Sequence, residues 1–474
     1  MSAHAFPRTP GFTNGGVSFW YRRAGLPRPR PALPGPRQYD VCIVGGGYTG
    51  LWTAYYLKKA RPDLRIAILE REFAGFGASG RNGGWLSAEI AGSKRRYAAR
   101  SGREPVVAFQ KAMMAAVDEV IAVCAQEGID ADIVKGGVLY AATNPAQRRR
   151  LRAEVAEARR WGWDEQDLYL LDRDESEKRL RLAGVLEAAY SPHCARIQPA
   201  KLALGLAQAT ERLGVDIFES TTVTEIRPRR GGRPAAAVTE HGEVTAEYVI
   251  RATEGFTAGL AGQRRQWLPM NSSMIVTEPL DAQVWERIGW EGREVLGDSA
   301  HAYIYAQRTA DDRIAIGGRG VPYRFGSRWD ERGATHLRTA AALQRMLAGL
   351  LPAAADARID HAWCGVLGVP RDWCSVVDVD RSSGLGLAGG YVGSGVTTTN
   401  LAGRTLRDLV LGESTELTRL PWVGRRVRRW EPEPLRWLGV RLIYTLYRAA
   451  DRRENGGLQT TSAYARLADL ISGR

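Results

Sequence analysis

The sequence predicts an α/β protein with a doubly wound, parallel-sheet domain of the dinucleotide-binding kind, into which a second domain is inserted. Three observations support this prediction. Residues 41–44 (VCIV) form an unbroken apolar run, which is typical of a strand buried on both faces of a parallel sheet. Gly45, Gly47 and Gly50 follow it in the spacing G-x-G-x-x-G. Glu70 ends the next apolar run, twenty positions after Gly50.

Each position of this glycine turn has a use in binding a dinucleotide. Gly45 allows the tight turn, Gly47 lets a pyrophosphate approach the backbone, and Gly50 lets the following helix pack against the strand. The first N–H groups of that helix, expected from about residue 51, would face the phosphates. Glu70 is placed to accept hydrogen bonds from ribose hydroxyls, and its charge argues against a nicotinamide cofactor with a 2′-phosphate.

Two further glycine-rich segments indicate which dinucleotide is bound. Residues 76–86 (FGASGRNGGWL) follow the second strand, and their glycines let the backbone pass close to a flat ring. Residues 389–404 (GGYVGSGVTTTNLAGR) form another glycine turn that opens an amphipathic helix. The positive end of that helix would stabilise the negative charge of a reduced flavin at its pyrimidine ring. Segments so far apart in the chain predict a long cofactor held at both ends.

With these motifs the chain resembles the FAD-dependent amine and amino-acid oxidoreductases of the D-amino-acid oxidase family, and among them the gamma-glutamylputrescine oxidase-like enzymes. The resemblance spans roughly residues 40–410 and includes residues 252–255 (ATEG), 277–279 (TEP) and 316–319 (IGGR). It implies a Rossmann-like FAD-binding domain of the glutathione-reductase type. The inserted substrate domain would be α+β, built on a mixed or antiparallel sheet that roofs the flavin.

The expected cofactor is FAD, held without a covalent bond. Its predicted contacts, taken from the motifs and from the resemblance, are Gly45, Gly46, Gly47, Tyr48, Thr49, Gly50, Glu70, Arg71, Ala78, Ser79, Arg81, Asn82, Gly83, Gly84, Val223, Ala252, Thr253, Gly255, Gly365, Gly393, Gly395, Val396, Thr397 and Thr398. Val223 would clamp the adenine with its backbone. In sarcosine oxidase relatives a cysteine in the region of Cys364 carries the flavin, so a covalent link through Cys364 is the alternative.

The substrate side of the flavin is expected to include Tyr303, Tyr305, Arg319 and Trp363. Tyrosine rings can hold an amine by cation–π contact, and their hydroxyls can orient it. Arg319 at a strand end could grip a substrate carboxylate with two hydrogen bonds. Trp363 precedes the glycine expected near the flavin. Structural, half-buried aromatic side chains and a surface arginine are the alternative interpretations.

The remaining elements follow from hydrophobic periodicity. Helices are expected at about 105–127, 145–160, 200–213 and 332–351, and strands at about 136–142, 187–190, 215–218, 221–227, 247–251, 271–278, 301–307, 312–318 and 361–365. In the strand over 301–307, alternation puts His301 on the same face as the two tyrosines, as a hydrogen-bonded sheet residue. The predicted domains are an N-terminal arm (1–38), the FAD-binding domain in three parts (39–104, 187–260 and 359–420), the substrate domain in two parts (105–186 and 261–358) and a basic C-terminal helical extension (421–474).

Length and composition limit the remaining possibilities. At 474 residues the chain suits two interleaved domains, and a hydrophobic content of 44% is ordinary for a soluble protein, so a cytoplasmic enzyme is expected. Residues 1–38 have no signal-peptide core and contain GLPRPRPALPGPR, which predicts an extended arm. The five cysteines show neither metal-ligand nor disulfide spacing, so no metal site is predicted.

A net charge of +14 would permit nucleic-acid binding, but the arginines are spread along the chain beside acids, so nucleic acid is not the expected partner. Residues 425–453 are the exception, because a basic run there joins an amphipathic helix. This segment could lie on a membrane surface or pack on a partner subunit, and packing against its own domain is the expectation. The sequence leaves the oligomeric state open.

The predicted activity is oxidation of the C–N bond of a primary or secondary amine or an amino acid, with hydride transfer to flavin N5 and hydrolysis of the imine product. The basic surface favours anionic or zwitterionic substrates, such as acylated amines, over free polyamines. By the resemblance, Thr397 and Thr398 stand where sarcosine oxidase has a flavin-contacting lysine, and they lack its charge. Reaction with O₂ could therefore be slow, so both an oxidase using O₂ and a dehydrogenase using another electron acceptor stay open. A flavin monooxygenase and a nucleic-acid-associated flavoprotein, such as a tRNA-modifying enzyme, are the alternatives.

Overall fold

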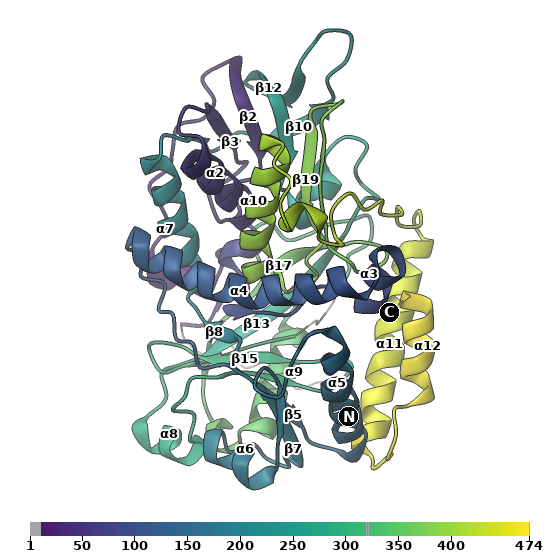
Figure 1. Ribbon diagram of the computed structural model, residues 1–474. Coiled ribbons are helices and arrows are strands. Elements are labelled where there is room, and N and C mark those ends of the chain that lie inside the picture. The colour runs from purple at the N-terminus through teal and green to yellow at the C-terminus, as the bar shows by residue number, and fades with distance from the viewer. Residues whose placement is uncertain (1–10, 319, 321, 474) are drawn as a thin grey trace.

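Two sheets, one above the other, form the framework of the computed structural model, which describes residues 11–318, 320 and 322–473 (Figure 1). The upper sheet in this view contains the strand that precedes the glycine turn. The lower sheet is built from the inserted segments together with residues 13–14, 187–191 and 359–369, which the sequence analysis assigned to the arm and to the FAD-binding domain. The long helix α4 (Arg103–Glu127) crosses the molecule between the two levels, and the C-terminal helices α11 (Leu435–Asn455) and α12 (Ala463–Ser472) stand together at one side.

The upper sheet has the parallel core that the sequence predicts. Its strand order is β10-β11-β12-β2-β3-β9, with β19 beside β12 and β18 beside β19. β2 runs parallel to β3 and β12, β3 to β9, and β12 to β19. The strands are β2 (Arg37–Val44), β3 (Ile66–Leu69), β9 (Asp216–Phe218), β10 (Val223–Arg227), β11 (Ala235–Thr239), β12 (Gly242–Arg251), β18 (Val376–Asp380) and β19 (Leu385–Gly389). Val41 and Ile43 enter one core cluster and Cys42 and Val44 another, so β2 is buried on both faces.

The lower sheet is mixed, and its strand order is β1-β17-β13-β16-β15-β14-β5-β7-β6. Only β1 with β17 and β5 with β14 pair in parallel among its described strands. The strands are β1 (Thr13–Asn14), β5 (Val138–Ala142), β6 (Tyr169–Leu171), β7 (Glu187–Ser191), β13 (Leu268–Thr277), β14 (Val295–Asp298), β15 (Tyr305–Arg308), β16 (Ile314–Gly318) and β17 (Ile359–Val369). A two-stranded ribbon of β4 (Trp85–Ser87) and β8 (Cys194–Arg196) joins the two levels of the chain.

Helices α2 (Tyr48–Ala60) and α10 (Gly395–Leu411) pack side by side in the core of the upper level, although about 350 positions separate them in the chain (Figure 1). Their backbones approach so closely at one point that a Cβ on Gly403 would lie 2.7 Å from the Cβ of Trp52. The other helices are α1 (Phe19–Ala24), α3 (Lys94–Ser101), α5 (Pro145–Ala158), α6 (Arg173–Arg179), α7 (Pro199–Arg212), α8 (Ala282–Ile288), α9 (Leu337–Leu350), α11 (Leu435–Asn455) and α12 (Ala463–Ser472).

The N-terminal segment is not the uniformly extended arm that its proline content predicts. Residues 19–24 form α1, and Phe19, Trp20 and Tyr21 are almost completely buried. The Trp20 indole donates a hydrogen bond to the Asn82 carbonyl at 2.8 Å. The segment before it adds strand β1 to the edge of β17. The aromatic residues of the arm therefore close a gap between the two levels, which the sequence pattern alone does not reveal.

The prediction of a strand over 301–307 is wrong at its beginning, because β15 starts only at Tyr305. Residues 299–304 form a loop whose backbone N–H groups are held by carboxylates. Asp451 accepts hydrogen bonds from the amides of His301 (2.9 Å) and Ala302 (3.0 Å). Asp298 accepts one from the Ile304 amide at 2.9 Å. Amides bound in this way cannot join a sheet ladder, which explains the late start.

Among the described residues, no helix is both long and apolar enough to cross a bilayer.

The burial of the arm predicts a large loss of stability when its indole is removed. We expect Trp20→Ala to lower the free energy of unfolding by about 3–5 kcal/mol, since a nearly fully buried aromatic side chain is replaced by a cavity. The matched control in the same arm is Leu26→Ala, whose side chain is 66% exposed and should leave stability unchanged. Denaturant titration of both variants checks this; equal midpoints for Trp20→Ala and wild type would contradict the packing described here.

Candidate cofactor and active site

A cavity lies at the carboxyl ends of the parallel strands, where open α/β sheets bind their ligands. The ends of β2, β3 and β12, a stretch of β17 and the turn before α10 all contribute to its wall. The predicted cofactor residues that line it are Gly45, Gly47, Tyr48, Thr49, Glu70, Arg71, Ala78, Ser79, Asn82, Val223, Ala252, Thr253, Gly393, Gly395 and Val396. The early and the late glycine motifs thus face one cavity, and the hydroxyls of Thr49 and Tyr391 lie 3.1 Å apart.

The other predicted cofactor residues lie one or two positions along the chain from lining residues, but outside the lining itself. They are Gly46, Gly50, Arg81, Gly83, Gly84, Gly255, Gly365, Thr397 and Thr398. Several of these glycines determine the shape of the cavity wall, because the lack of a side chain lets neighbouring backbone or an aromatic ring approach closely.

The glycine turn has no room for side chains at two of its positions. Gly45 has φ +109°, and a Cβ there would lie 2.6 Å from the carbonyl oxygen of Ala252. A Cβ on Gly50 would lie 2.1 Å from the carbonyl oxygen of Gly45. Helix α2 therefore starts directly at the strand end, and its N-cap Gly47 offers no side-chain acceptor to the first-turn amides. A phosphate is the ligand that such a helix start suits.

Glu70 stands at the end of β3 and borders the cavity near Arg71 and Val223. Its carboxylate accepts hydrogen bonds from the amides of Gly46 at 2.7 Å and Glu72 at 3.0 Å. Burial raises the pKa of Glu70, against the lowering effect of these two N–H groups. The carboxylate links the glycine turn to the neighbouring strand, and it faces the part of the cavity where a ribose would need an acceptor.

Glu254 is a lining residue that the sequence reasoning missed. It follows β12 and adopts φ +41°, which is uncommon for a residue with a side chain. Its carboxylate accepts hydrogen bonds from the amides of Gly390 (2.9 Å), Tyr391 (3.0 Å) and Gly368 (2.5 Å). One side chain thus joins the end of β12 to β17 and to the turn before α10. Its position in the segment ATEG (residues 252–255), three positions after the end of a buried strand, is the signal that could have identified it.

Burial raises the pKa of Glu254 to about 7, in spite of the three N–H donors and the nearby Arg251, which all lower it. The Arg251 guanidinium lies over the Trp267 ring at 4.6 Å and is itself buried, which lowers its pKa to about 10. The junction of the three segments therefore contains a carboxyl group that changes its charge near neutral pH.

The start of α10 forms the opposite end of the cavity. Gly393, Gly395, Val396 and Thr399 line it, and the N-cap Ser394 makes no side-chain hydrogen bond to the helix amides. Thr398 donates its hydroxyl to the Ser394 carbonyl at 2.5 Å. The Thr397 hydroxyl is buried without a hydrogen-bond partner among the described residues. An uncapped helix start and an unused hydroxyl suit the pyrimidine end of a flavin, which gains negative charge on reduction.

The Asn82 side chain fixes the conformation of the block GRNGG (residues 80–84). The Asn82 amide group donates to the carbonyls of Ala78 and Ser79 and accepts from the Gly84 amide, which fixes the loop at the cavity wall. Arg81 does not line the cavity. It is 2% exposed, donates to the carbonyls of Phe76 and Glu331, and lies over the Phe76 ring.

Tyr305 packs its ring against two glycines that the sequence singled out. A Cβ on Gly83 or on Gly317 would lie within 2.6 Å of this ring, so both positions must lack a side chain. The Tyr305 hydroxyl lies 2.8 Å from Ser272 Oγ on β13. The ring of Trp85 meets that of Tyr305 edge to face, with centroids 6.4 Å apart. Both rings are partly exposed; Tyr305 belongs to the lower sheet and Trp85 to the ribbon strand β4, whereas Tyr303 lies in the loop before β15.

Trp363, predicted to line the pocket, is fully buried elsewhere. Its indole donates to the Arg81 carbonyl at 2.9 Å and packs among Phe19, Trp20 and His361. These contacts are those of a structural aromatic residue, which is the alternative interpretation given for Trp363 in the sequence analysis. His361 interacts through Nε2 with the Gly15 carbonyl at 2.7 Å, and burial lowers its pKa to about 4. Arg319 lies outside the described residues.

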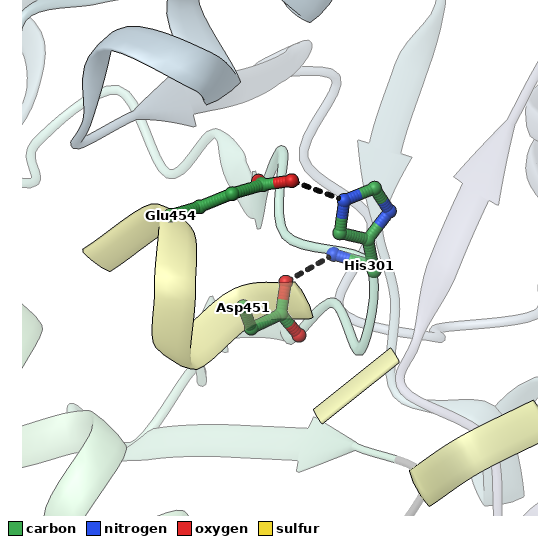
Figure 2. A group of neighbouring side chains, drawn as sticks. All are labelled: His301, Asp451 and Glu454. Carbon is green, nitrogen blue, oxygen red and sulfur yellow. Dashed lines mark hydrogen bonds and ion pairs between the residues drawn. The ribbon is translucent and has the colours of Figure 1, made fainter. Parts of the chain in front are cut away.

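His301, Asp451 and Glu454 form the group of possible metal ligands that the described residues contain (Figure 2). Their acceptor atoms are already used. Glu454 meets His301 Nε2 at 2.8 Å, accepts the Ser462 amide at 3.0 Å and pairs with Arg150 at 3.1 Å. The Arg150 charge would repel a cation. The group therefore fastens α11 to the loop before β15, with the His301 ring stacked on Tyr447.

Comparisons with known proteins agree with this geometry. Residues 40–409 match the family model DAO, described as FAD dependent oxidoreductase. The gamma-glutamylputrescine oxidoreductase of Escherichia coli is 30% identical over 82% of this chain and 89% of its own length. The probable oxidoreductase OrdL of Rhizobium meliloti is 29% identical over 87% and 91%. The crystal structure of glycine oxidase from Geobacillus kaustophilus superposes with a TM-score of 0.65 at 24% identity, over 82% of this chain and 99% of that one.

The sheet topology and the residues around the cavity together define an FAD-dependent oxidoreductase. The glycine turn suits a pyrophosphate, Glu70 suits a ribose, and the start of α10 suits the flavin ring, so the residues fit the cofactor. The chain belongs to the DAO family of FAD-dependent oxidoreductases, and the predicted resemblance is confirmed.

The lack of space at the glycine turn predicts a specific loss of FAD. We expect Gly50→Ala to weaken FAD binding at least tenfold, because the new methyl group would force the turn and α2 apart. Gly439→Ala is the matched control, since a Cβ at that helical position meets no atom within 4 Å. Flavin absorbance per protein after gel filtration checks this; full flavin content in Gly50→Ala would contradict the assignment of the turn.

The raised pKa of Glu254 predicts a pH-dependent stability term. Between pH 4.5, the ordinary pKa of a glutamate, and about pH 7, the pKa in the folded protein, Glu254 is deprotonated in the unfolded chain but still protonated in the folded protein. This group therefore lowers the free energy of unfolding as the pH rises through that window, by about 3 kcal/mol in total. Glu254→Gln stays neutral, so its stability relative to wild type should increase from pH 4.5 to pH 7. Denaturant titrations across this range test the expectation, and parallel pH profiles would refute it.

Proposed function

We propose that this protein oxidises the C–N bond of a primary or secondary amine or an amino acid, with FAD bound non-covalently, and that the imine product is then hydrolysed by water. The observation that carries the proposal is the cavity shared by the glycine turn and the start of α10, next to the sheet that carries Tyr305. Bound FAD supplies a two-electron acceptor for the hydride of the carbon beside the nitrogen.

The protein's own part in this reaction is to place the substrate and to support charge. The Tyr305 ring offers a π face to an amine, and its hydroxyl is held by Ser272 at 2.8 Å. The Trp85 ring packs edge to face against that of Tyr305 and so limits its movement. A neutral amine placed in this way needs no catalytic triad or metal. The amides at the start of α10 and the Thr397 hydroxyl would stabilise negative charge that develops beside them.

Non-covalent binding is supported by the surroundings of Cys364. Its thiol is directed to the Ala334 carbonyl at 3.4 Å, and burial raises its pKa to about 11. The residue does not belong to the cavity lining. A protonated, buried thiol is a poor nucleophile. We therefore expect denaturation to release the flavin from the polypeptide.

The proposed substrate is a zwitterionic or anionic amine, such as an acylated amine or an amino acid. The relatives include enzymes named for gamma-glutamylputrescine and for glycine. A protein with a net charge of +14 attracts anionic groups and repels free polyamines. Thr397 and Thr398 supply hydroxyls but no charge at the start of α10. The electron acceptor of the proposed reaction is therefore either O₂ or another oxidant.

Anaerobic titration of the purified yellow protein with a panel of amines and amino acids tests the proposal. We expect bleaching of the flavin by at least one zwitterionic amine, with release of an aldehyde or keto product. Tyr305→Phe should raise the substrate concentration needed for half-maximal bleaching about three- to tenfold, because the ring loses its anchor on Ser272. Tyr464→Phe on α12 is the control. Bleaching by NADPH alone, with none by any amine, would instead favour the monooxygenase alternative.

A further inference from the structure

The C-terminal hairpin of α11 and α12 lies outside the segment matched by the family model, which ends at residue 409. One face of it packs on the rest of the chain. Val440, Ile443, Tyr444 and Tyr447 join a core cluster that also contains Met270 of β13. In Figure 1 the hairpin stands at one side of the molecule, from the height of α3 down along the lower level. The inner face of the hairpin thus packs against the rest of the chain, as the sequence analysis expects for the extension.

The outer face of the hairpin is unusually apolar. Nine large apolar side chains are exposed among the described residues, and six of them lie on these two helices. They are Leu435 (62% exposed), Leu438 (51%), Leu442 (49%), Tyr464 (40%), Leu467 (47%) and Leu470 (79%). Leu435, Leu438 and Leu442 follow the spacing i, i+3, i+7, so they form one stripe along α11. A concentration of exposed leucines at one place marks an interaction surface.

The charge of this face has a single sign. Five exposed arginines lie on the hairpin, namely Arg441, Arg448, Arg452, Arg453 and Arg466, and three more, Arg426, Arg428 and Arg429, precede α11. None of the extension's acidic residues is exposed within the described part of the chain. The acids are used by inward contacts instead, for example Asp451 with the His301 amide, Glu454 with Arg150, and Asp469 with Tyr447. Leucines and arginines, with no exposed acid of the described extension beside them, therefore cover the outer face.

We propose that the outer face of the α11–α12 hairpin docks on an anionic lipid surface. Its leucines would enter the boundary between headgroups and acyl chains, and its arginines would pair with lipid phosphates. A second copy of this chain is a poor occupant, because pairing the same face of two molecules would bring the two arginine sets together. The attachment is peripheral, since no described helix qualifies as a membrane span. This inference concerns where the enzyme works and does not depend on its substrate.

Vesicle flotation with the FAD-loaded full chain tests this inference. We expect wild type to float with vesicles of phosphatidylglycerol and phosphatidylcholine, and binding to fall at least tenfold on pure phosphatidylcholine. Leu438→Asp/Leu442→Asp should also lose at least tenfold, because two charges replace the apolar stripe. The matched control is Leu26→Asp/Leu170→Asp, two exposed leucines elsewhere on the surface, which should bind like wild type.

Four results would overturn the inference. The first is absence of flotation with anionic vesicles, and the second is equal flotation on both lipid compositions. The third is equal binding by Leu438→Asp/Leu442→Asp and wild type, which would mean that the leucine stripe takes no part in binding. The fourth is a dimer in solution that only the α11 variant dissociates, which would assign the face to a second copy. Flavin content and melting temperature are measured on every variant, so that an unfolded protein is not mistaken for one that fails to bind.

Discussion

The Glu254 carboxylate holds together the three segments on which the cofactor site depends. It stands at the end of β12 and accepts amides from β17 and from the turn before α10, which are more than 100 positions away along the chain. Without an acceptor at this point, three N–H groups would be left without partners at the cavity wall, which costs about 1–3 kcal/mol each. One buried carboxylate at the end of β12 therefore accepts the N–H groups of β17 and of the turn before α10, and in this way it fixes the shape of the cavity wall.

Other hydrogen bonds around the site also join segments that lie far apart in the chain. Trp20 and Trp363 donate their indole N–H groups to the carbonyls of Asn82 and Arg81, so aromatic residues from the arm and from β17 hold the GRNGG block. At the far side, Asp451 and Glu454 hold the loop that leads into Tyr305 (Figure 2). The C-terminal extension thus holds the loop before β15 and also presents a basic, apolar outer face. Attachment to a surface through that face would leave the inner contacts intact.

Much of the fold could be predicted from the sequence, because local patterns encode it. The strand over 41–44, the glycine turn and Glu70 lie within 30 residues of one another, and each has a steric or hydrogen-bonding role that its spacing reveals. What could not be predicted depends on partners distant in the chain. No local feature of residues 301–304 shows that Asp451 takes two of their amides, so alternation wrongly extended β15. Trp363 likewise sits on a strand whose covering aromatic residues come from the arm.

The central claim is that one extended FAD molecule links the early glycine turn to the start of α10. A crystal structure of the protein with FAD tests it most directly. The pyrophosphate should lie within hydrogen-bond distance of the first-turn amides of α2, the ribose at Glu70, and the pyrimidine ring at the amides of residues 395–397 with Glu254 still bound to Gly390 and Tyr391. Density for the flavin ring at any place remote from the start of α10 would contradict it.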